Sequence, residues 1–67
     1  MVLLNEIKAE RIKAGLTQRQ IAEKMFISPG SYNHKEQGNR PFSFDDVDAF
    51  GQALGLSKER LVEIFFA

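Results

Sequence analysis

One pattern of apolar and polar residues occurs four times along the chain. An apolar residue is followed by serine or threonine, and a second apolar residue stands five positions after the first: Leu16-Thr17 with Ile21, Ile27-Ser28 with Tyr32, Phe42-Ser43 with Val47, and Leu56-Ser57 with Leu61. A hydroxyl at this point accepts a hydrogen bond from the first turn of a helix, and the two apolar side chains pack together as a hydrophobic staple. Each occurrence therefore predicts the start of a helix.

Further residues predict how the helices begin and end. Gln20 and Asp46 stand three positions after Thr17 and Ser43, where their side chains can complete capping boxes. Helices often end at a glycine, and Gly15, Gly38 and Gly55 follow the first, third and fourth apolar segments. No segment alternates with the period of two that is typical of strands. The sequence predicts an all-α fold, a compact bundle of five helices in one domain over residues 1–67, with helices near 3–14, 18–25, 29–37, 44–54 and 58–65.

Helical spacing also predicts the core. On the first helix, an apolar stripe about 100° wide has a charged residue, Arg11, in its middle; its other members are Leu3, Leu4, Ile7 and Ala14. A buried guanidinium requires a carboxylate partner, because an unpaired buried charge is strongly destabilising. Glu36, one turn beyond Tyr32 on the inward face of the third helix, is the expected partner. The remaining residues expected to face inward are Ile21, Ala22 and Met25 on the second helix and Phe44, Val47, Phe50 and Leu54 on the fourth.

Charge is unevenly distributed along a chain that is neutral as a whole. The 67 residues include nine Lys or Arg and nine Asp or Glu. Residues 1–43 hold seven basic and four acidic side chains, whereas residues 44–67 hold two basic and five acidic. The resulting dipole would turn the first half of the chain toward phosphates, more weakly than a strongly basic protein would.

Several classes of function are not expected from this sequence. No apolar run approaches the roughly 20 residues that cross a bilayer, so we expect a cytoplasmic protein. His34 is the only histidine and there is no cysteine, so we expect no metal site. We find no Ser/His/Asp set and no glycine-rich phosphate loop, and therefore expect neither an enzyme nor a cofactor.

In its order of elements, the chain resembles the lambda-type Cro and repressor (XRE-like) family of helix-turn-helix domains. The resemblance covers nearly all residues and rests on Arg11, Gly15-Leu16-Thr17-Gln18, Ala22 and Glu36-Gln37-Gly38. It implies a helix-turn-helix unit at about residues 17–37, double-stranded operator DNA as the partner, and a structural ion pair between Arg11 and Glu36. Gln18, Gln37 and Arg40 would contact the DNA backbone, and the third helix would read bases. The DNA-binding residues it implies are Thr17, Gln18, Arg19, Ser31, Asn33, His34, Gln37 and Arg40.

Four residues depart from the family pattern. Pro29 and Gly30 stand where the family commonly has Gln, Arg or Lys, so direct base reading falls to Ser31, Asn33 and His34. Glycine within a helix lowers stability by about 1 kcal/mol relative to alanine, so Gly30 indicates close approach of another backbone or a loosely held helix. Phe26 stands where the family often has a glycine with positive φ. Lys35 replaces an apolar residue, which predicts a weakly anchored third helix.

Two functions fit these observations. The first is a small sequence-specific transcriptional regulator of the Cro and repressor type, related to phage, whose last helix forms a homodimer through a partly exposed patch of Val62, Ile64 and Phe66. Leu61 and Phe65 would then complete the core. The alternative is an antirepressor or repressor modulator that uses the scaffold to bind another regulatory protein. Its binding surface would include Phe26, Gly30 and Tyr32.

Overall fold

The computed structural model describes all residues from Met1 to Ala67 and contains five α-helices and no strand. The helices are α1 (Leu4–Lys13), α2 (Gln18–Lys24), α3 (Pro29–Glu36), α4 (Phe44–Leu54) and α5 (Lys58–Phe65). Each bound lies within one residue of the predicted range. The all-α fold and its five helices are therefore confirmed.

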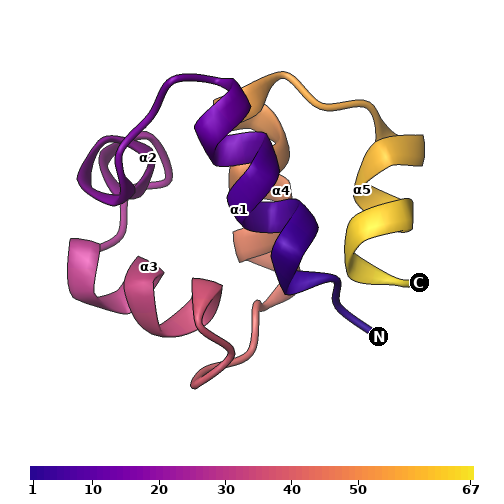
Figure 1. Ribbon diagram of the computed structural model, residues 1–67, viewed down its shortest axis with the longest axis horizontal. Coiled ribbons are helices and arrows are strands. Elements are labelled where there is room, and N and C mark those ends of the chain that lie inside the picture. The colour runs from indigo at the N-terminus through magenta and orange to yellow at the C-terminus, as the bar shows by residue number, and fades with distance from the viewer.

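The five helices enclose a single core (Figure 1). In this view α2 and α3 lie together on the left and α5 lies on the right, with α1 and α4 between them. Helix α2 packs on α3 and α4, whereas α5 packs on α4 and α1. The α2–α3 pair therefore presents an outer surface on the side of the molecule away from α5.

All four predicted N-caps are present. The hydroxyls of Thr17, Ser28, Ser43 and Ser57 each accept a hydrogen bond from the backbone N–H three residues later, at 3.1 Å. Both capping boxes are closed, since the N–H groups of Thr17 and Ser43 donate to the side chains of Gln20 and Asp46. Each such cap contributes about 1 kcal/mol to helix stability. The hydroxyl pattern thus sets the starts of α2 to α5, while α1 begins without a side-chain cap.

Eight apolar residues are buried: Ile7, Ile21, Ala22, Met25, Tyr32, Phe50, Ile64 and Phe65. The ring of Phe65 meets Phe42 and Phe50 edge to face, with centroid separations of 5.1 and 5.6 Å. Such edge-to-face contacts place the positive edge of one ring against the negative face of the next. These three rings therefore join α5 to α4 and to the loop that precedes α4.

Three residues occupy positions that differ from those predicted. Phe44, expected in the core, is 81% exposed, because it opens α4 to one side of the stripe formed by Val47, Phe50 and Leu54. Ile64, expected outside, is fully buried. It belongs to the inward stripe that begins at Leu61, and its carbonyl accepts a hydrogen bond from Leu3 N at 2.8 Å. Ala14, expected on the inward stripe of α1, is exposed just beyond the end of that helix.

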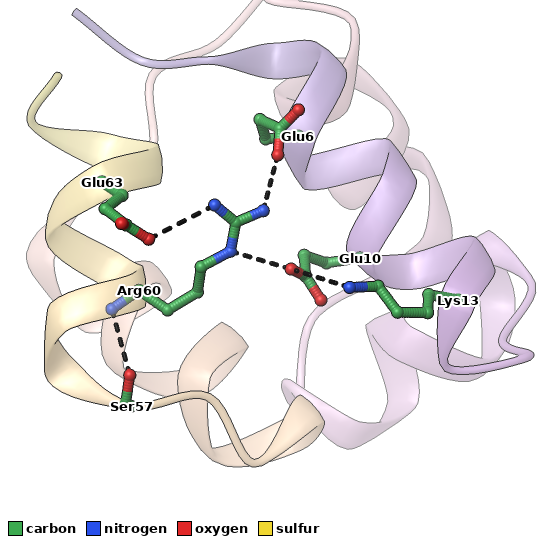
Figure 2. Close-up of polar contacts among 6 residues, drawn as sticks. All are labelled: Glu6, Glu10, Lys13, Ser57, Arg60 and Glu63. Carbon is green, nitrogen blue, oxygen red and sulfur yellow. Dashed lines mark hydrogen bonds and ion pairs between the residues drawn. The ribbon is translucent and has the colours of Figure 1, made fainter.

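A guanidinium also ties α5 to α1 (Figure 2). Arg60 of α5 binds Glu6 and Glu10 of α1 and Glu63 of its own helix, and Lys13 binds the same Glu10 oxygen from the other side. The Arg60 Nε to Glu10 Oε2 distance is 2.9 Å. Because three carboxylates surround one partly exposed guanidinium, the acidic residues of α1 are neutralised on the side of the molecule that faces α5.

Two helical glycines have opposite surroundings. At Gly51 of α4, an added Cβ would lie 2.6 Å from Leu61 Cδ1, so glycine permits the close packing of α4 on α5. At Gly30 of α3, an added Cβ would meet no atom within 4 Å. The expectation that another backbone approaches Gly30 is therefore wrong within this chain.

This contrast predicts opposite effects of the same substitution. Gly30→Ala should raise the free energy of unfolding by about 0.5–1 kcal/mol, because alanine is the better helix former. Gly51→Ala gains the same propensity but forces Leu61 to move, and overpacking costs about 1–3 kcal/mol, so the net effect is a loss. Urea unfolding of both variants measures the difference, and equal shifts of the same sign would contradict the described packing.

Candidate functional site

A buried ion pair between Arg11 and Glu36 lies behind the α2–α3 surface. The Nε and Nη2 atoms of Arg11 donate to the two oxygens of Glu36 at 2.9 and 3.1 Å. The third nitrogen, Nη1, donates to the carbonyl of Leu16 at 2.8 Å. The predicted pair is thus confirmed as a two-pronged contact, which fixes geometry as well as charge. It joins α1 to the end of α3 and to Leu16 in the loop before α2.

Both members of the pair are charged at neutral pH. Burial alone would raise the pKa of Glu36, but hydrogen bonds from Arg11 and Gln18, together with the nearby Tyr32 hydroxyl, outweigh it and hold that pKa below its usual value. The hydrogen bond to Glu36 raises the pKa of Arg11, despite opposition from burial. The pair therefore behaves as a fixed structural element rather than as an acid or base.

Tyr32 reaches the same buried region from the middle of α3. Its side chain is fully buried and its hydroxyl has no hydrogen-bond partner. Burial raises the pKa of Tyr32 well above its usual value, and the nearby Glu36 carboxylate adds to this effect. Its predicted inward position is therefore confirmed, and the alternative that includes Tyr32 in a protein-binding surface is wrong, because no partner protein can reach a core residue.

Polar side chains from three segments line an open hollow over the ion pair. Gln18, the first residue of α2, donates from Nε2 to Glu36 Oε1 at 3.4 Å. Around it stand Gln37, at the end of α3, and Asn5 and Lys8 of α1. The structure thus places Gln18 and Gln37 on one hollow, whereas the resemblance implied that Gln37 contacts the DNA backbone on the far side from Gln18. It also places Asn5 and Lys8 there, two residues that the sequence analysis did not name. Their spacing was the available signal, since Asn5, Lys8 and Arg11 follow one another at three-residue intervals along one face of α1.

The other side chains predicted to contact the DNA backbone lie at the ends of α2 and α3. Thr17 is exposed, but its hydroxyl already caps α2, so its main role is structural. Arg19 is exposed in the first turn of α2. Arg40 is exposed in the loop after α3, where its backbone N–H and that of Asn39 both donate to the His34 carbonyl. These bonds fold the loop back on α3. The exposed Arg40 side chain has no ion-pair partner.

Ion pairing changes the charge that this half of the molecule presents. Among residues 1–43, Glu6 and Glu10 bind Arg60 and Glu36 binds Arg11, which leaves Glu23 as the only carboxylate without an ion-pair partner. Four exposed cations of the same segment form no ion pair: Lys8, Arg19, Lys24 and Arg40. In residues 1–43 of a neutral chain, four unpaired positive side chains therefore stand against one unpaired carboxylate.

The outer face of α3 carries only short side chains at its start. Pro29 and Gly30 are exposed, Ser31 and Asn33 are half-buried, and His34 is exposed one turn further along. Ser28 caps the helix, and proline is favoured in the first turn because its missing N–H would otherwise be unpaired. His34, Asn33 and Ser31 are thus the side chains of α3 with polar groups near solvent, as predicted.

In addition to the buried Tyr32, an ion pair anchors helix α3 at Lys35, where an apolar residue was expected. Lys35 binds Asp46 of α4, and the same Asp46 oxygen accepts a hydrogen bond from Ser43 N. Burial would raise the pKa of Asp46, but the bonds from Lys35 and Ser43 together hold it below its usual value. The prediction of a weakly anchored third helix is therefore wrong. Asp46 was assigned only to the start of α4, and its second role depends on a contact across helices that no local pattern reveals.

Phe26 occupies the turn between α2 and α3 in a strained conformation. Its φ is +60°, which confirms the expected left-handed position, and its side chain is 94% exposed. The left-handed conformation costs an L-residue with a side chain roughly 1–2 kcal/mol. Since the ring gains no burial in return, Phe26 contributes nothing evident to the stability of the fold.

A family model described as a helix-turn-helix domain matches residues 3–64. No curated protein and no solved structure matches the chain. None of the five helices is long and apolar enough to cross a membrane. No three His, Cys, Asp or Glu side chains are grouped so that they could hold a metal ion.

The ion pair predicts a large loss of stability when one partner is removed. Glu36→Gln should lower the free energy of unfolding by about 3–5 kcal/mol, because it leaves the Arg11 guanidinium buried without its counter-charge. Glu63→Gln removes a carboxylate that also binds an arginine, but at the surface, and should change stability by less than about 1 kcal/mol. Denaturant unfolding of the two variants at pH 7 tests this difference, and equal losses would contradict it.

The carboxylates of Glu36 and Asp46 determine how the stability of the fold responds to acid. The folded pKa values of Glu36 and Asp46 are depressed, so protons bind the unfolded chain first as the pH falls. Their stabilising contribution is complete above the ordinary values of 4.5 and 3.8 and is lost as the pH falls through the lower folded values. The unfolding free energy of the Glu36→Gln variant should therefore depend less steeply on pH below about 4.5.

The unpartnered hydroxyl of Tyr32 gives a separate prediction. Tyr32→Phe removes a buried polar group that has no hydrogen-bond partner, so stability should stay unchanged or rise by up to about 1 kcal/mol. A thermal melt compared with that of the wild type measures this. A loss above about 1 kcal/mol would show instead that the hydroxyl donates a hydrogen bond to Glu36.

Proposed function

The chain belongs to the helix-turn-helix domain family, and from this premise we propose that it is a sequence-specific DNA-binding transcriptional regulator of the Cro and repressor type, related to phage regulators. The observation that carries the proposal is the set of unpaired cations around α2 and α3. Phosphate contacts dominate the affinity of proteins for DNA, so a neutral chain needs its positive charge concentrated where the duplex lies. Ion pairing with Arg60 and Arg11 supports this concentration by neutralising three of the four carboxylates of residues 1–43.

Backbone contacts would hold the duplex against α2 and the ends of α1 and α3. Lys8, Gln18 and Gln37 line one hollow, and each can donate a hydrogen bond to a phosphate oxygen. Gln18 is held in place by its contact with Glu36, so its side chain is positioned before DNA arrives. Contacts of this kind fix orientation on the duplex and carry no sequence information themselves.

Base reading would come from the outer face of α3 in the major groove. Its polar side chains near solvent are Ser31, Asn33 and His34, and the open space at Gly30 allows the helix backbone to approach the bases closely. Three side chains can distinguish only a few base pairs by direct contact. We therefore propose that sequence-dependent DNA shape supplies much of the specificity.

A second function, as an antirepressor or repressor modulator, is supported by Phe26 alone. A fully exposed ring in a strained turn suits a protein contact, since strained residues concentrate at functional sites. The surface first expected for this role is reduced to Phe26 and Gly30, because Tyr32 is buried. Loss of binding to a partner repressor in Phe26→Ala, with no DNA binding in the wild type, would favour this function.

Two variants that each remove one lysine, and so have the same net charge, test the DNA-binding proposal. Lys8→Ala should weaken binding to duplex DNA of every sequence and reduce the slope of log affinity against log salt by about 0.9, the value for one lost phosphate contact. Lys58→Ala removes an unpaired lysine of α5, on the other side of the molecule, and should leave the slope nearly unchanged. Fluorescence anisotropy over a salt series measures both. Absence of measurable affinity at low salt would reject the proposal.

A further inference from the structure

Helices α4 and α5 carry a second exposed apolar surface, and α5 lies on the opposite side of the molecule from the α2–α3 unit in Figure 1. The surface consists of Phe44, Val62 and Phe66, which we call the Phe44–Phe66 surface. We propose that it binds a basic amphipathic segment of another protein, in which apolar side chains are flanked by arginine or lysine. This interaction is separate from the proposed DNA contacts and does not depend on them.

The apolar part of the surface is unusually exposed for so small a domain. Phe44 is 81% exposed, while Val62 and Phe66 are 55% and 54% exposed. The two rings stack at a centroid distance of 6.3 Å, so α4 and α5 contribute to one continuous patch. Beside the rings, a groove is lined by Val2, Phe42, Val47 and Phe65, with Ser43 as its only polar residue. Exposed apolar patches of this kind mark interaction sites.

Acidic side chains border this patch on both helices. On α4, Asp45 directly follows Phe44. Asp48 stands one turn after Phe44, on the same side of the helix. On α5, Glu59 stands three residues before Val62, and Glu63 three residues before Phe66. Asp45, Asp48 and Glu59 form no ion pair, and Glu63 remains largely exposed beside Arg60. The apolar strip is therefore bordered by negative charge.

Few cations compensate for these carboxylates. Helix α4 contains no Lys or Arg, and α5 contains only Lys58 and Arg60. Arg60 is directed toward α1, where it binds Glu6 and Glu10 (Figure 2). Lys58, in the first turn of α5, is the one unpaired cation of these two helices, and the Met1 ammonium beside Phe66 donates to the Ala67 carbonyl at 2.8 Å. A partner that places apolar side chains on the rings and cations beside the carboxylates would complement both parts of the surface.

The same charges disfavour a second copy of this chain as the occupant. A twofold dimer places the same patch on both sides of the interface, so the acidic borders of the two copies would face each other. Like charges brought together at an interface are unfavourable. The homodimer expected from Val62, Ile64 and Phe66 is untested, and one of its three residues is buried. Charge complementarity thus favours a basic segment.

The experiment uses fluorescein-labelled peptides and the whole chain. The probe is a helix-forming peptide of leucine and arginine with one apolar face, and the control peptide carries glutamate in place of arginine. The basic peptide should bind, more weakly as salt rises, and the acidic peptide should bind at least about tenfold more weakly. Phe44→Ala should reduce binding at least about tenfold, as loss of an aromatic anchor does, whereas Ile12→Ala, which shortens an exposed apolar side chain of α1, should not.

Charge variants and sedimentation complete the test. Asp48→Asn combined with Glu59→Gln should weaken peptide binding several-fold, while Glu23→Gln on α2 should not. Since Phe44 is exposed, its variant should keep the wild-type melting temperature; if it does not, Phe66→Ala replaces it. Equal binding by the Phe44 and Ile12 variants, or by the two peptides, would overturn the proposal. Sedimentation of the chain alone as a dimer that Phe44→Ala dissociates would overturn it in favour of a second copy.

Discussion

The contact between Arg11 and Glu36 determines how the helices of this domain are placed. One guanidinium binds a carboxylate at the end of α3 and a carbonyl just before α2, so a single side chain of α1 fixes the positions of both helices. An apolar residue could fill the same space without specifying direction. Because the two-pronged contact has only one good geometry, it orients the surface on which the proposed DNA contacts lie. Gln18 rests on the same carboxylate, which links the candidate site directly to the pair.

Ion pairs also decide which charges remain available at the surface. Arg60 gathers three carboxylates on the α5 side of α1, and Lys35 binds Asp46 between α3 and α4. The unpaired cations that remain lie mostly on the first half of the chain, while the unpaired carboxylates lie mostly on α4 and α5. The molecule is therefore divided into a face suited to an anionic partner and a face suited to a cationic one, although its formal charge is zero.

Features set by neighbouring residues were predictable from the sequence, and features set by contacts across helices were less so. The hydroxyl caps and glycine ends depend on three or four residues, and this local chemistry predicts the starts of α2 to α5 and the ends of α1, α3 and α4. The Arg11–Glu36 pair was also predictable, since a charge on an apolar stripe requires a partner. The Lys35–Asp46 pair was not, because Asp46 stands off the apolar stripe of α4 and no local pattern identifies a partner for Lys35.

The errors at Phe44 and Ile64 have a common cause. Helical spacing identifies several apolar positions on α4 and α5, but the small core accepts only the stripe that points at neighbouring helices. A strongly apolar segment can therefore offer more apolar positions than the interior can hold. Lys8 was missed for a different reason: α1 had been given only a structural role, and its solvent-facing side meets Gln18 and Gln37 only after the helices assemble.

The four hydroxyl caps also bear on how the chain acquires its structure. Each cap joins groups only three residues apart, so the boundaries of α2 to α5 can be specified before distant segments meet. Short-range contacts of this kind require little loop closure, and helical domains rich in them fold within microseconds to milliseconds. Assembly then reduces to docking segments whose lengths are already settled, with the guanidinium of α1 selecting one arrangement among them.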